Sequence, residues 1–266
     1  MTSNSHAVIL PTYNSGPALA TVVAEVWRVW QPVIVVVDGS TDQSDHAIRE
    51  LATSEPGLTV VALRVNSGKG AAVLAGARLA RARGHTHVLV MDADGQHPTT
   101  HIGDFMRVSE ANPGTLVLGR PQFPPNIPPE RLHGRKLSVG LVRFEIGGRG
   151  IDDPLFGFRV YPLDPLLSAL EGRRTGRRYD FDTEVAVRLF WAGVPVMNVP
   201  APVRYFSRAE GGISHFRYGR DNARLAWMHV RLITEFLCWR WPGVVRRRWR
   251  TARRESTVTL APDSGR

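Results

Sequence analysis

Several features that define whole classes of proteins are scarce or absent in this sequence. The 266 residues include a single cysteine, Cys238, which excludes an internal disulfide and a cysteine-based zinc site. No run of about 18 uncharged apolar residues occurs, so the sequence predicts no membrane-spanning helix. The N-terminal residues have neither the charged nor the apolar region of a signal peptide, and we therefore expect a reducing, cytoplasmic setting.

The overall composition is that of a folded globular chain. Hydrophobic residues make up 43% of the sequence and charged residues 22%, which excludes wholesale disorder, collagen and a pure coiled coil. The length corresponds to one or two domains with a core of their own.

Positive charge is concentrated in one part of the sequence. The formal net charge is +10, and only two of the 34 basic residues are lysines. Residues 204–254 contain thirteen arginines and three acidic residues, so this segment accounts for the whole net charge and the remainder is neutral. A basic region of this kind attracts nucleic acid, anionic lipid or phosphate-bearing ligands.

Short apolar runs alternate with helical patterns. The runs are nearly all apolar, as in strands buried on both faces of a parallel sheet, and lie at residues 7–10, 33–37, 58–63, 88–91 and 116–118. Residues 19–30 and 69–84, between them, have helical patterns. The sequence therefore predicts an α/β fold, with a mostly parallel, Rossmann-like sheet flanked by helices and ligands beyond the carboxyl ends of the strands.

The second half of the sequence is less regular. Five prolines in residues 121–129 predict a loop, because proline fits neither a helix interior nor a central strand. Helices are expected at 130–147 and 181–193, an edge strand at 194–205 and an amphipathic segment at 220–239. We divide the chain into a catalytic domain (1–216), a basic amphipathic helical extension (217–254) and a flexible tail (255–266).

Polar residues follow three of the predicted strands. Asp38 comes after the second, and Asp92 and Asp94 come after the fourth. Because the carboxyl ends of parallel strands meet at one edge of a sheet, these carboxylates should lie together, where they repel one another unless a cation joins them. Asp92, Asp94 and Gln96 supply the oxygen ligands that suit Mg²⁺ or Mn²⁺.

The common nucleotide-binding fingerprints are absent. Neither a P-loop nor a G-x-G-x-x-G motif follows the first strand. The segment Asn66-Ser-Gly-Lys-Gly70 follows the third strand and opens a helix, so its amides and Lys69 are candidates for binding phosphate.

Taken together and in order, the motifs resemble family 2 glycosyltransferases, and within them the dolichyl-phosphate mannose synthase and polyprenyl-phosphate sugar synthase branch. The similarity runs from about residue 7 to 216. It is carried by Val8-Ile-Leu-Pro-Thr-Tyr-Asn14, Asp38-Gly-Ser-Thr-Asp42, Asn66-Ser-Gly-Lys-Gly-Ala-Ala72, Asp92-Ala-Asp-Gly-Gln-His-Pro98, Asp153-Pro-Leu-Phe-Gly-Phe-Arg159, Phe181-Asp-Thr-Glu184 and, loosely, Gly212-Ile-Ser-His215.

The resemblance implies a GT-A fold, a nucleotide-sugar donor and a divalent metal bound by Asp92, Asp94 and Gln96. It also implies that Pro11, Tyr13, Asn14 and Asp38 hold the nucleoside, and that Asn66, Gly68 and Lys69 lie near it or its phosphates. Arg120 and Arg208 resemble the family's phosphate-binding arginines. Metal and guanidinium would neutralise the charge that grows on a nucleoside diphosphate leaving group.

Two positions depart from the family pattern. Val37 stands where the family usually has an acid, which leaves open the contact to base or ribose and the identity of the donor. His215 stands where the family usually has lysine, so a fixed charge has become a titratable one.

The general base is open at this point. A phosphate acceptor is already ionised and needs none, whereas a hydroxyl acceptor needs a carboxylate within hydrogen-bond reach. By resemblance Asp153 is the first choice, because the corresponding acid of the family faces the acceptor, and Glu184 is the second.

The sequence thus predicts a metal-dependent, inverting glycosyltransferase with a UDP- or GDP-linked sugar donor and a lipid acceptor, such as a polyprenyl phosphate. One alternative is a nucleotidyltransferase-like enzyme, although residues 11–14 are not its Gly-rich, basic first loop. Another is a nucleic-acid-binding module built on the arginine-rich C-terminus, but no nucleic-acid motif accompanies it, and we expect no nucleic-acid partner.

The C-terminal extension suggests peripheral attachment to the inner face of an anionic membrane. Leu225, Met228, Leu232 and Phe236 form a helical stripe, and four tryptophans and a cluster of arginines accompany it. The competing interpretation is that this stripe packs on the body of the enzyme and leaves only the arginine cluster free.

Overall fold

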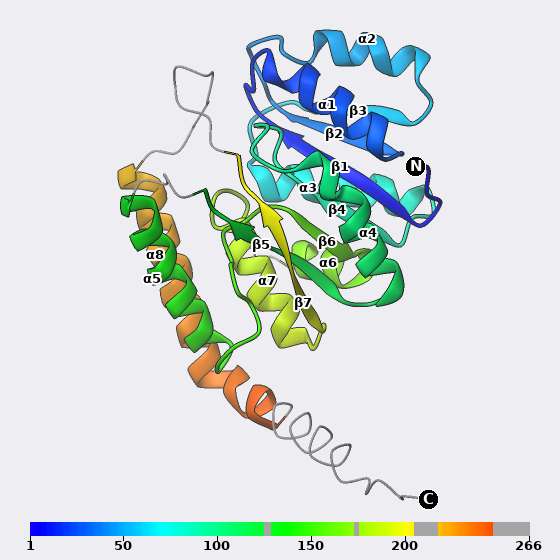
Figure 1. Ribbon diagram of the computed structural model, residues 1–266. Helices are drawn as coiled ribbons and strands as arrows, with labels where there is room; N and C mark the ends of the chain where they lie inside the picture. The colour runs from blue at the N-terminus through cyan, green and yellow to red at the C-terminus, as the bar shows by residue number, and fades with distance from the viewer. Residues whose placement is uncertain (125–128, 173–175, 205–217, 247–266) are drawn as a thin grey trace, which may run out of the picture.

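The computed structural model describes residues 1–124, 129–172, 176–204 and 218–246. Arg208, His215, the end of the extension and the tail lie outside these residues. The described strands form one seven-stranded sheet with the order β3-β2-β1-β4-β6-β5-β7 (Figure 1). The strands are β1 (His6–Thr12), β2 (Val33–Asp38), β3 (Leu58–Leu63), β4 (His87–Val90), β5 (Leu116–Gln122), β6 (Arg159–Pro162) and β7 (Val196–Pro202).

All the strand pairs are parallel except those of β6, which runs antiparallel to both β4 and β5. β1 pairs with β2 on one side and with β4 on the other, so the carboxyl ends of these three strands lie along the same edge of the sheet. This confirms the mostly parallel sheet that the sequence predicts.

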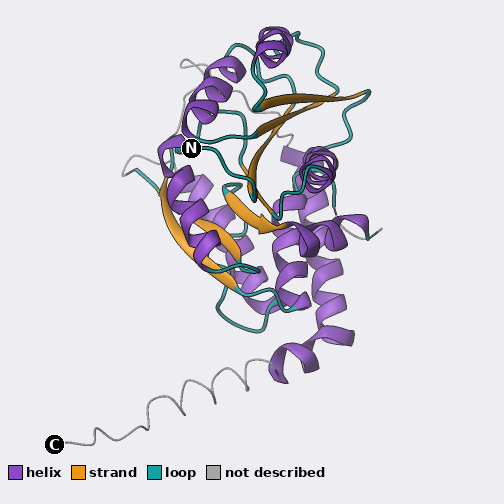
Figure 2. Cartoon of the chain, turned by 90° about the vertical axis from the view of Figure 1, so that its right-hand side faces the viewer, coloured by secondary structure: helices purple, strands orange, loops and turns teal. Residues whose placement is uncertain are grey.

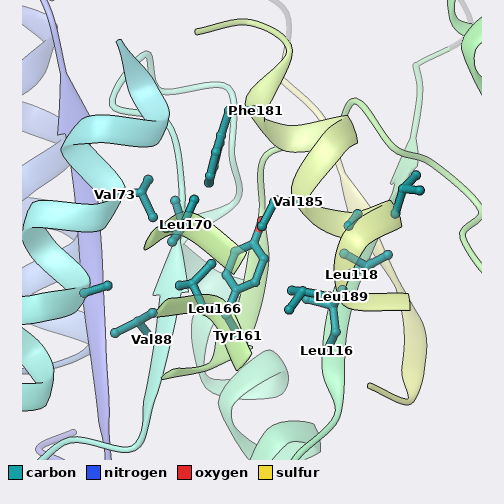
Figure 3. Packing of buried hydrophobic residues seen from close by; sticks show 14 of the residues in the cluster. Val73, Val88, Leu116, Leu118, Tyr161, Leu166, Leu170, Phe181, Val185 and Leu189 are labelled. Carbon is teal, nitrogen blue, oxygen red and sulfur yellow. The ribbon is translucent and has the colours of Figure 1, made fainter. Parts of the chain in front are cut away.

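Helices cover both faces of the sheet. Successive residues of β1 alternate between two apolar clusters, because side chains on a strand point to opposite faces in turn. α3 (Lys69–Ala82), α6 (Leu163–Glu171) and α7 (Phe181–Ala192) contribute to one cluster, and Figure 3 shows Val73, Leu170 and Val185 gathered near Tyr161 of β6. The other cluster includes residues of α1 (Ala18–Val29), α2 (His46–Ser54) and α4 (Ile102–Ala111), which the short 3-10 helix η1 (Thr99–His101) precedes.

Two further helices lie side by side at one end of the molecule. α5 (Pro129–Glu145) packs beside α8 (Tyr218–Glu235), and both views show the pair running together away from the sheet (Figures 1 and 2). A π-helical turn, η3 (Phe236–Arg240), extends α8, and the chain stays helical through residue 246.

The predicted membrane stripe of the extension packs inside the protein. Met228, Leu232 and Phe236 are 1%, 0% and 7% exposed and belong to the same apolar cluster as α3 and α7, and Leu225 packs against them. The prediction that this stripe faces a membrane is therefore wrong, and the part of the competing interpretation that packs the stripe on the body of the enzyme is confirmed. The reason is that α5 and α7 offer the stripe an apolar surface of the protein's own.

The Pro-rich loop is also shorter than predicted. β5 continues through Pro121 to Gln122, and α5 begins at Pro129. Pro121 is tolerated because β5 pairs with β6 only at Val117 and Leu118, so at Pro121 the strand has a neighbour on the β7 side alone.

Candidate active site

The loops after β1 and β2 are tied to each other at the carboxyl edge of the sheet. The backbone N–H of Asn14 donates to Ser40 Oγ at 3.0 Å, and its side-chain Oδ1 accepts from the N–H of Thr41 at 2.7 Å. Asn14 has a φ of 45°, a left-handed conformation that asparagine tolerates better than most residues. Pro11 is buried within β1, and Tyr13 is half-buried in the loop. The structure thus brings together three of the four predicted nucleoside contacts.

Asp38, the fourth, lies at the end of β2 and is 4% exposed. Its Oδ1 accepts the N–H of Ser67 and its Oδ2 accepts the N–H of Gly68, both at 2.7 Å. Asp38 therefore fixes the loop that opens α3. Val37, at the position of the family's usual acid, is 3% exposed and packs in an apolar cluster.

The loop before α3 is held from its other side by residues 176–180. Arg178 donates from Nη1 to Asn66 Oδ1 at 2.8 Å, and the N–H of Gly70 donates to the carbonyl of Arg177 at 2.9 Å. Gly68 has a φ of 95°, and a Cβ there would lie 2.1 Å from the same carbonyl. Only glycine fits this approach, because a side chain would meet rigid backbone.

A charged cluster occupies the centre of the site. Lys69 Nζ lies 2.6 Å from Asp92 Oδ1 and 2.7 Å from Asp182 Oδ2, and His97 Nε2 lies 3.2 Å from the other oxygen of Asp92. Gly157 leaves room for this arrangement, since a Cβ there would lie 2.6 Å from Asp92 Oδ2. Residues from β4, α3 and α7 thus converge on one point.

The sequence analysis missed Asp182 as a site residue. It belongs to the segment Phe181-Asp-Thr-Glu184, which contributes to the family resemblance, but only Glu184 of that segment was a candidate catalytic residue. On a helix, residues two apart project about 200° apart, so Asp182 and Glu184 cannot serve the same site in the same way. The lysine at the start of α3 was the available signal, because a buried ammonium needs carboxylate partners.

The electrostatics of Asp92 and Asp94 are opposed. Partial burial works against ionisation, but the Lys69 ammonium and His97 hold the pKa of Asp92 well below its usual range. Burial, and then the negative charge of Asp92, raises the pKa of Asp94 above its ordinary value. Asp94 Oδ1 accepts the N–H of Gln96 at 3.0 Å. A carboxylate whose ionisation is disfavoured by an ionised neighbour fits a divalent cation, which relieves that repulsion.

The two candidate bases lie in different surroundings. Asp153 is 5% exposed, and its Oδ1 accepts the N–H groups of Leu155 and Phe156 at 2.9 and 3.0 Å. Its Oδ2 accepts from Arg135 of α5 at 2.7 Å. Burial raises the pKa of Asp153 even though this guanidinium opposes the shift.

Glu184 is fully buried, and both of its oxygens are bonded. Oε1 accepts from Arg188 at 2.7 and 2.8 Å, and Oε2 accepts from Arg231 at 2.6 Å and from the N–H of Gly176 at 2.7 Å. This geometry joins α7 to α8 and favours a structural role. Arg120 is 54% exposed in its side chain and lies 3.8 Å from Asp152.

The sequence is similar to those of named glycosyltransferases. Polyprenol monophosphomannose synthase of Mycolicibacterium smegmatis is 32% identical over 218 residues, which cover 78% of this chain and 79% of that protein. Dolichyl-phosphate beta-glucosyltransferase ALG5A of Trichomonas vaginalis is 26% identical over 217 residues, which are 73% of this chain and 64% of that protein's length.

Solved structures share the fold. Glucosyl-3-phosphoglycerate synthase from Mycobacterium tuberculosis, in complex with Mn²⁺, UDP-glucose and phosphoglyceric acid, superposes with a TM-score of 0.61 at 20% identity and covers 89% of this chain and 79% of its own. The mannosyltransferase PcManGT from Pyrobaculum calidifontis, in complex with GDP-Man and Mn²⁺, gives 0.59 at 19% identity and covers 87% and 64%.

These similarities confirm the predicted GT-A fold and decide between the enzyme classes that the sequence left open. A nucleotidyltransferase-like enzyme is set aside. The model of Glycosyl transferase family 2 matches residues 7–161, more than half of the sequence, and the chain belongs to that family of glycosyltransferases.

Proposed function

We propose that this glycosyltransferase moves a sugar from a UDP- or GDP-linked donor to a lipid acceptor, preferably a polyprenyl phosphate, with a divalent cation and with inversion at the anomeric carbon. The observation that carries the proposal is the cluster of Lys69, Asp92 and Asp182, which lies where the parallel strands of a family 2 sheet end. The 32% identical relative, which is named as a synthase of polyprenol monophosphomannose, supports the choice of acceptor.

The donor would lie across the carboxyl edge of the sheet. The loops that hold Tyr13, Asn14 and Asp38 face the nucleoside, and the loop at Asn66 and Gly68 lies near its phosphates. Arg120 and Arg208 would add positive charge to the diphosphate. Hydrogen bonds tie these loops to one another, which supports this role, because preorganised groups lose little entropy on binding.

Asp92, Asp94 and Gln96 would hold Mg²⁺ or Mn²⁺. The raised pKa of Asp94 beside Asp92 supports a cation there. Among the described residues, no three His, Cys, Asp or Glu side chains are grouped to hold a metal by themselves, which suits a site completed by an amide oxygen and the donor's diphosphate. When bound, the cation would neutralise charge on the leaving diphosphate. Lys69 would balance the charge of Asp92 and Asp182 and keep both carboxylates in place.

A lipid phosphate needs no protein base, because it is ionised at neutral pH. Asp153 remains the candidate base for a hydroxyl acceptor, and its raised pKa would favour proton uptake. In-line attack on the anomeric carbon would invert its configuration. The acceptor would place the enzyme at the inner face of a membrane as a peripheral protein. No helix within the described residues is long and apolar enough to span a membrane.

The proposal is tested by a donor screen followed by a transfer assay. UDP- and GDP-sugars are added with and without Mn²⁺, and a rise in Tm identifies the donor. That donor is then incubated with a short polyprenyl phosphate, and mass spectrometry detects the glycosyl lipid phosphate. We expect a metal-dependent product whose anomeric configuration is inverted.

An exposed acid provides the matched control. Asp164 of α6 is 78% exposed in its side chain, and Asp164→Asn should leave product formation unchanged. Transfer of sugar to a soluble acceptor but not to polyprenyl phosphate would disprove the proposed lipid acceptor. Undiminished transfer in excess chelator would disprove the proposed requirement for a divalent cation.

A further inference from the structure

Helix α8, with the turns that continue it to residue 246, carries apolar side chains on two faces. One face packs in the core through Met228 and Leu232. At about 100° per residue, Trp227 and Val230 project to the opposite side of the helix, and they are 65% and 52% exposed. Among the described residues, one apolar face of α8 is therefore covered by the protein itself, whereas the apolar residues on its other side are exposed.

Exposed apolar side chains are concentrated on the α5–α8 pair. Of thirteen large hydrophobic residues that are exposed in the described part of the chain, eight lie on α5 or on α8 and its continuation. We call these eight the outer apolar surface, and they are Leu137, Phe144, Trp227, Val230, Leu237, Trp239, Trp241 and Val245. Three of them are tryptophans, the residue type that favours the headgroup level of a membrane.

A basic pocket adjoins this surface. It measures about 300 Å³ and lies between residues 177–180 and α8. Its lining includes Trp227 of the outer apolar surface and one acid, Asp180. We call it the arginine pocket, after Arg177, Arg178, Arg224 and Arg231.

The positive charge of the arginine pocket is only partly balanced. Arg231 shares Glu184 with Arg188, and Arg224 shares Asp221 with Arg220. Arg178 bonds to the neutral Asn66. The side chain of Arg177 has no hydrogen bond or ion pair to any described residue. Arginines brought together without equal numbers of carboxylates favour an anion, and guanidinium groups match phosphate oxygens in shape and charge.

We propose that the outer apolar surface docks on an anionic bilayer and that the arginine pocket binds the phosphate of one of its phospholipids. The pocket and the apolar surface meet at Trp227, as the headgroup and the acyl region of a lipid meet. Residues 247–254 add five arginines next to this surface in the sequence. Nucleic acid would suit the arginines but not exposed Val230, Leu237 and Val245, so a bilayer accounts for both features.

The proposal deepens the proposed function, because it names the surface through which the enzyme would reach a lipid acceptor. The pocket is lined by α8 and residues 177–180 and contains none of the carboxylates at the catalytic centre. Binding to vesicles without donor, and sugar transfer to an acceptor in detergent, can therefore fail independently of each other.

Co-flotation of the full chain with vesicles tests the proposal. We expect binding to vesicles of phosphatidylglycerol and phosphatidylcholine, and much weaker binding to phosphatidylcholine alone. Arg177→Gln with Arg224→Gln should weaken binding to the anionic vesicles about thirtyfold. Trp227→Ser with Trp241→Ser should weaken it at least about tenfold. Arg177→Gln alone keeps the test valid if the double variant unfolds, since the Arg177 side chain bonds to none of the described residues.

The matched control removes the same charge elsewhere. Arg28 of α1 and Arg83 after α3 are exposed, and Arg28→Gln with Arg83→Gln should leave vesicle binding within about twofold. If this control loses as much vesicle binding as the pocket variant, the loss reflects net charge alone, and the proposal that the arginine pocket binds a phospholipid is overturned. Inorganic phosphate is the second probe. If it stabilises the wild type but not the pocket variant while both bind vesicles equally, the site takes a free phosphate and the lipid proposal fails. Failure of the wild type to float at low salt, or its co-purification with a protein that covers the tryptophans, would also overturn it.

Discussion

Two acids on the first turn of α7 enter very different surroundings. Asp182 faces Lys69 and, through it, Asp92 at the open edge of the sheet. Glu184, two residues later, points into the protein and is fully buried between α7 and α8. Both acids lie on the same helix and pair with basic side chains, Asp182 with a lysine and Glu184 with two arginines. They differ in how completely their oxygens are used.

At Glu184 each carboxylate oxygen accepts two hydrogen bonds, so a substrate proton would have to displace one of them. At Asp182 one oxygen accepts from Lys69, while Oδ1 is buried with no hydrogen bond to the described residues. In the same site, burial and the charge of Asp92 raise the pKa of Asp94. From this comparison we expect the saturated cluster to hold the fold and the unsaturated cluster to have capacity left for a ligand.

The largest effect is expected at the unsaturated cluster. Asp92→Asn removes the charge that holds Lys69 and one of the predicted metal ligands, so turnover should fall about a thousandfold while the fold stays intact. Steady-state kinetics and far-UV circular dichroism measure the two outcomes. Full activity in this variant would show that the cluster is structural, like that of Glu184.

Glu184→Gln should give the opposite pattern. Removal of the charge leaves Arg231 without its carboxylate and should lower the free energy of unfolding by about 3 kcal/mol. Turnover of the folded enzyme should stay near that of the wild type. Chemical denaturation measures the free energy of unfolding, and kinetics at denaturant concentrations below the unfolding transition measure the turnover. Glu110→Gln, at an exposed position, is the control. A loss of turnover without a loss of stability would make Glu184 a base after all.

The strands of the first half of the fold could be predicted because their signals are local. Each strand from β1 to β5 contains an apolar run, although β3 lies at the sheet edge and only its first residue, Leu58, is buried. Parallel pairing brings the polar residues that follow β1, β2 and β4 to one edge. The strand β6 and the helices α2, α4 and α6 were not predicted. β6 has only four residues and contains Arg159, a charge that hides the strand pattern. In the structure Arg159 is 0% exposed, and it donates to the carbonyls of Pro154, Phe156 and Asp182.

The roles of acids and of apolar stripes in the second half depend on what packs against them. Whether Asp182 or Glu184 faces the site is set by how α7 is rotated against α3 and α8. The stripe at Met228 was assigned to a membrane because the sequence does not show that α5 and α7 cover it. Periodicity identifies a helix face, but it does not identify the neighbour of that face.

Asp153 offers a smaller effect that sharpens the comparison, since it is bonded like Glu184 but lies in the loop before β6. With a polyprenyl phosphate acceptor, Asp153→Asn should lower turnover by less than about tenfold, because the acceptor is already ionised. Donor affinity should be unchanged. A loss of about a hundredfold with this acceptor, together with loss of the acidic limb of the pH profile, would instead show that Asp153 acts as a base even though the acceptor is a phosphate.

The smallest effect concerns stability at Asp94 and differs in sign from that at Glu184. Because burial and Asp92 raise the pKa of Asp94 in the folded protein, the folded state binds this proton more tightly than the unfolded chain. Stability is therefore lost as pH rises from the ordinary aspartate pKa through the raised one, and the loss persists at neutral pH. Asp94→Asn removes it, so in chelator at pH 7 the Tm should rise by about 2 °C, and the gain should vanish toward pH 3. Mn²⁺ should then stabilise the wild type but not the variant, so that in Mn²⁺ the wild type has the higher Tm. A variant that is less stable than the wild type in chelator at pH 7 would show that Asp94, like Glu184, is satisfied by its protein neighbours alone.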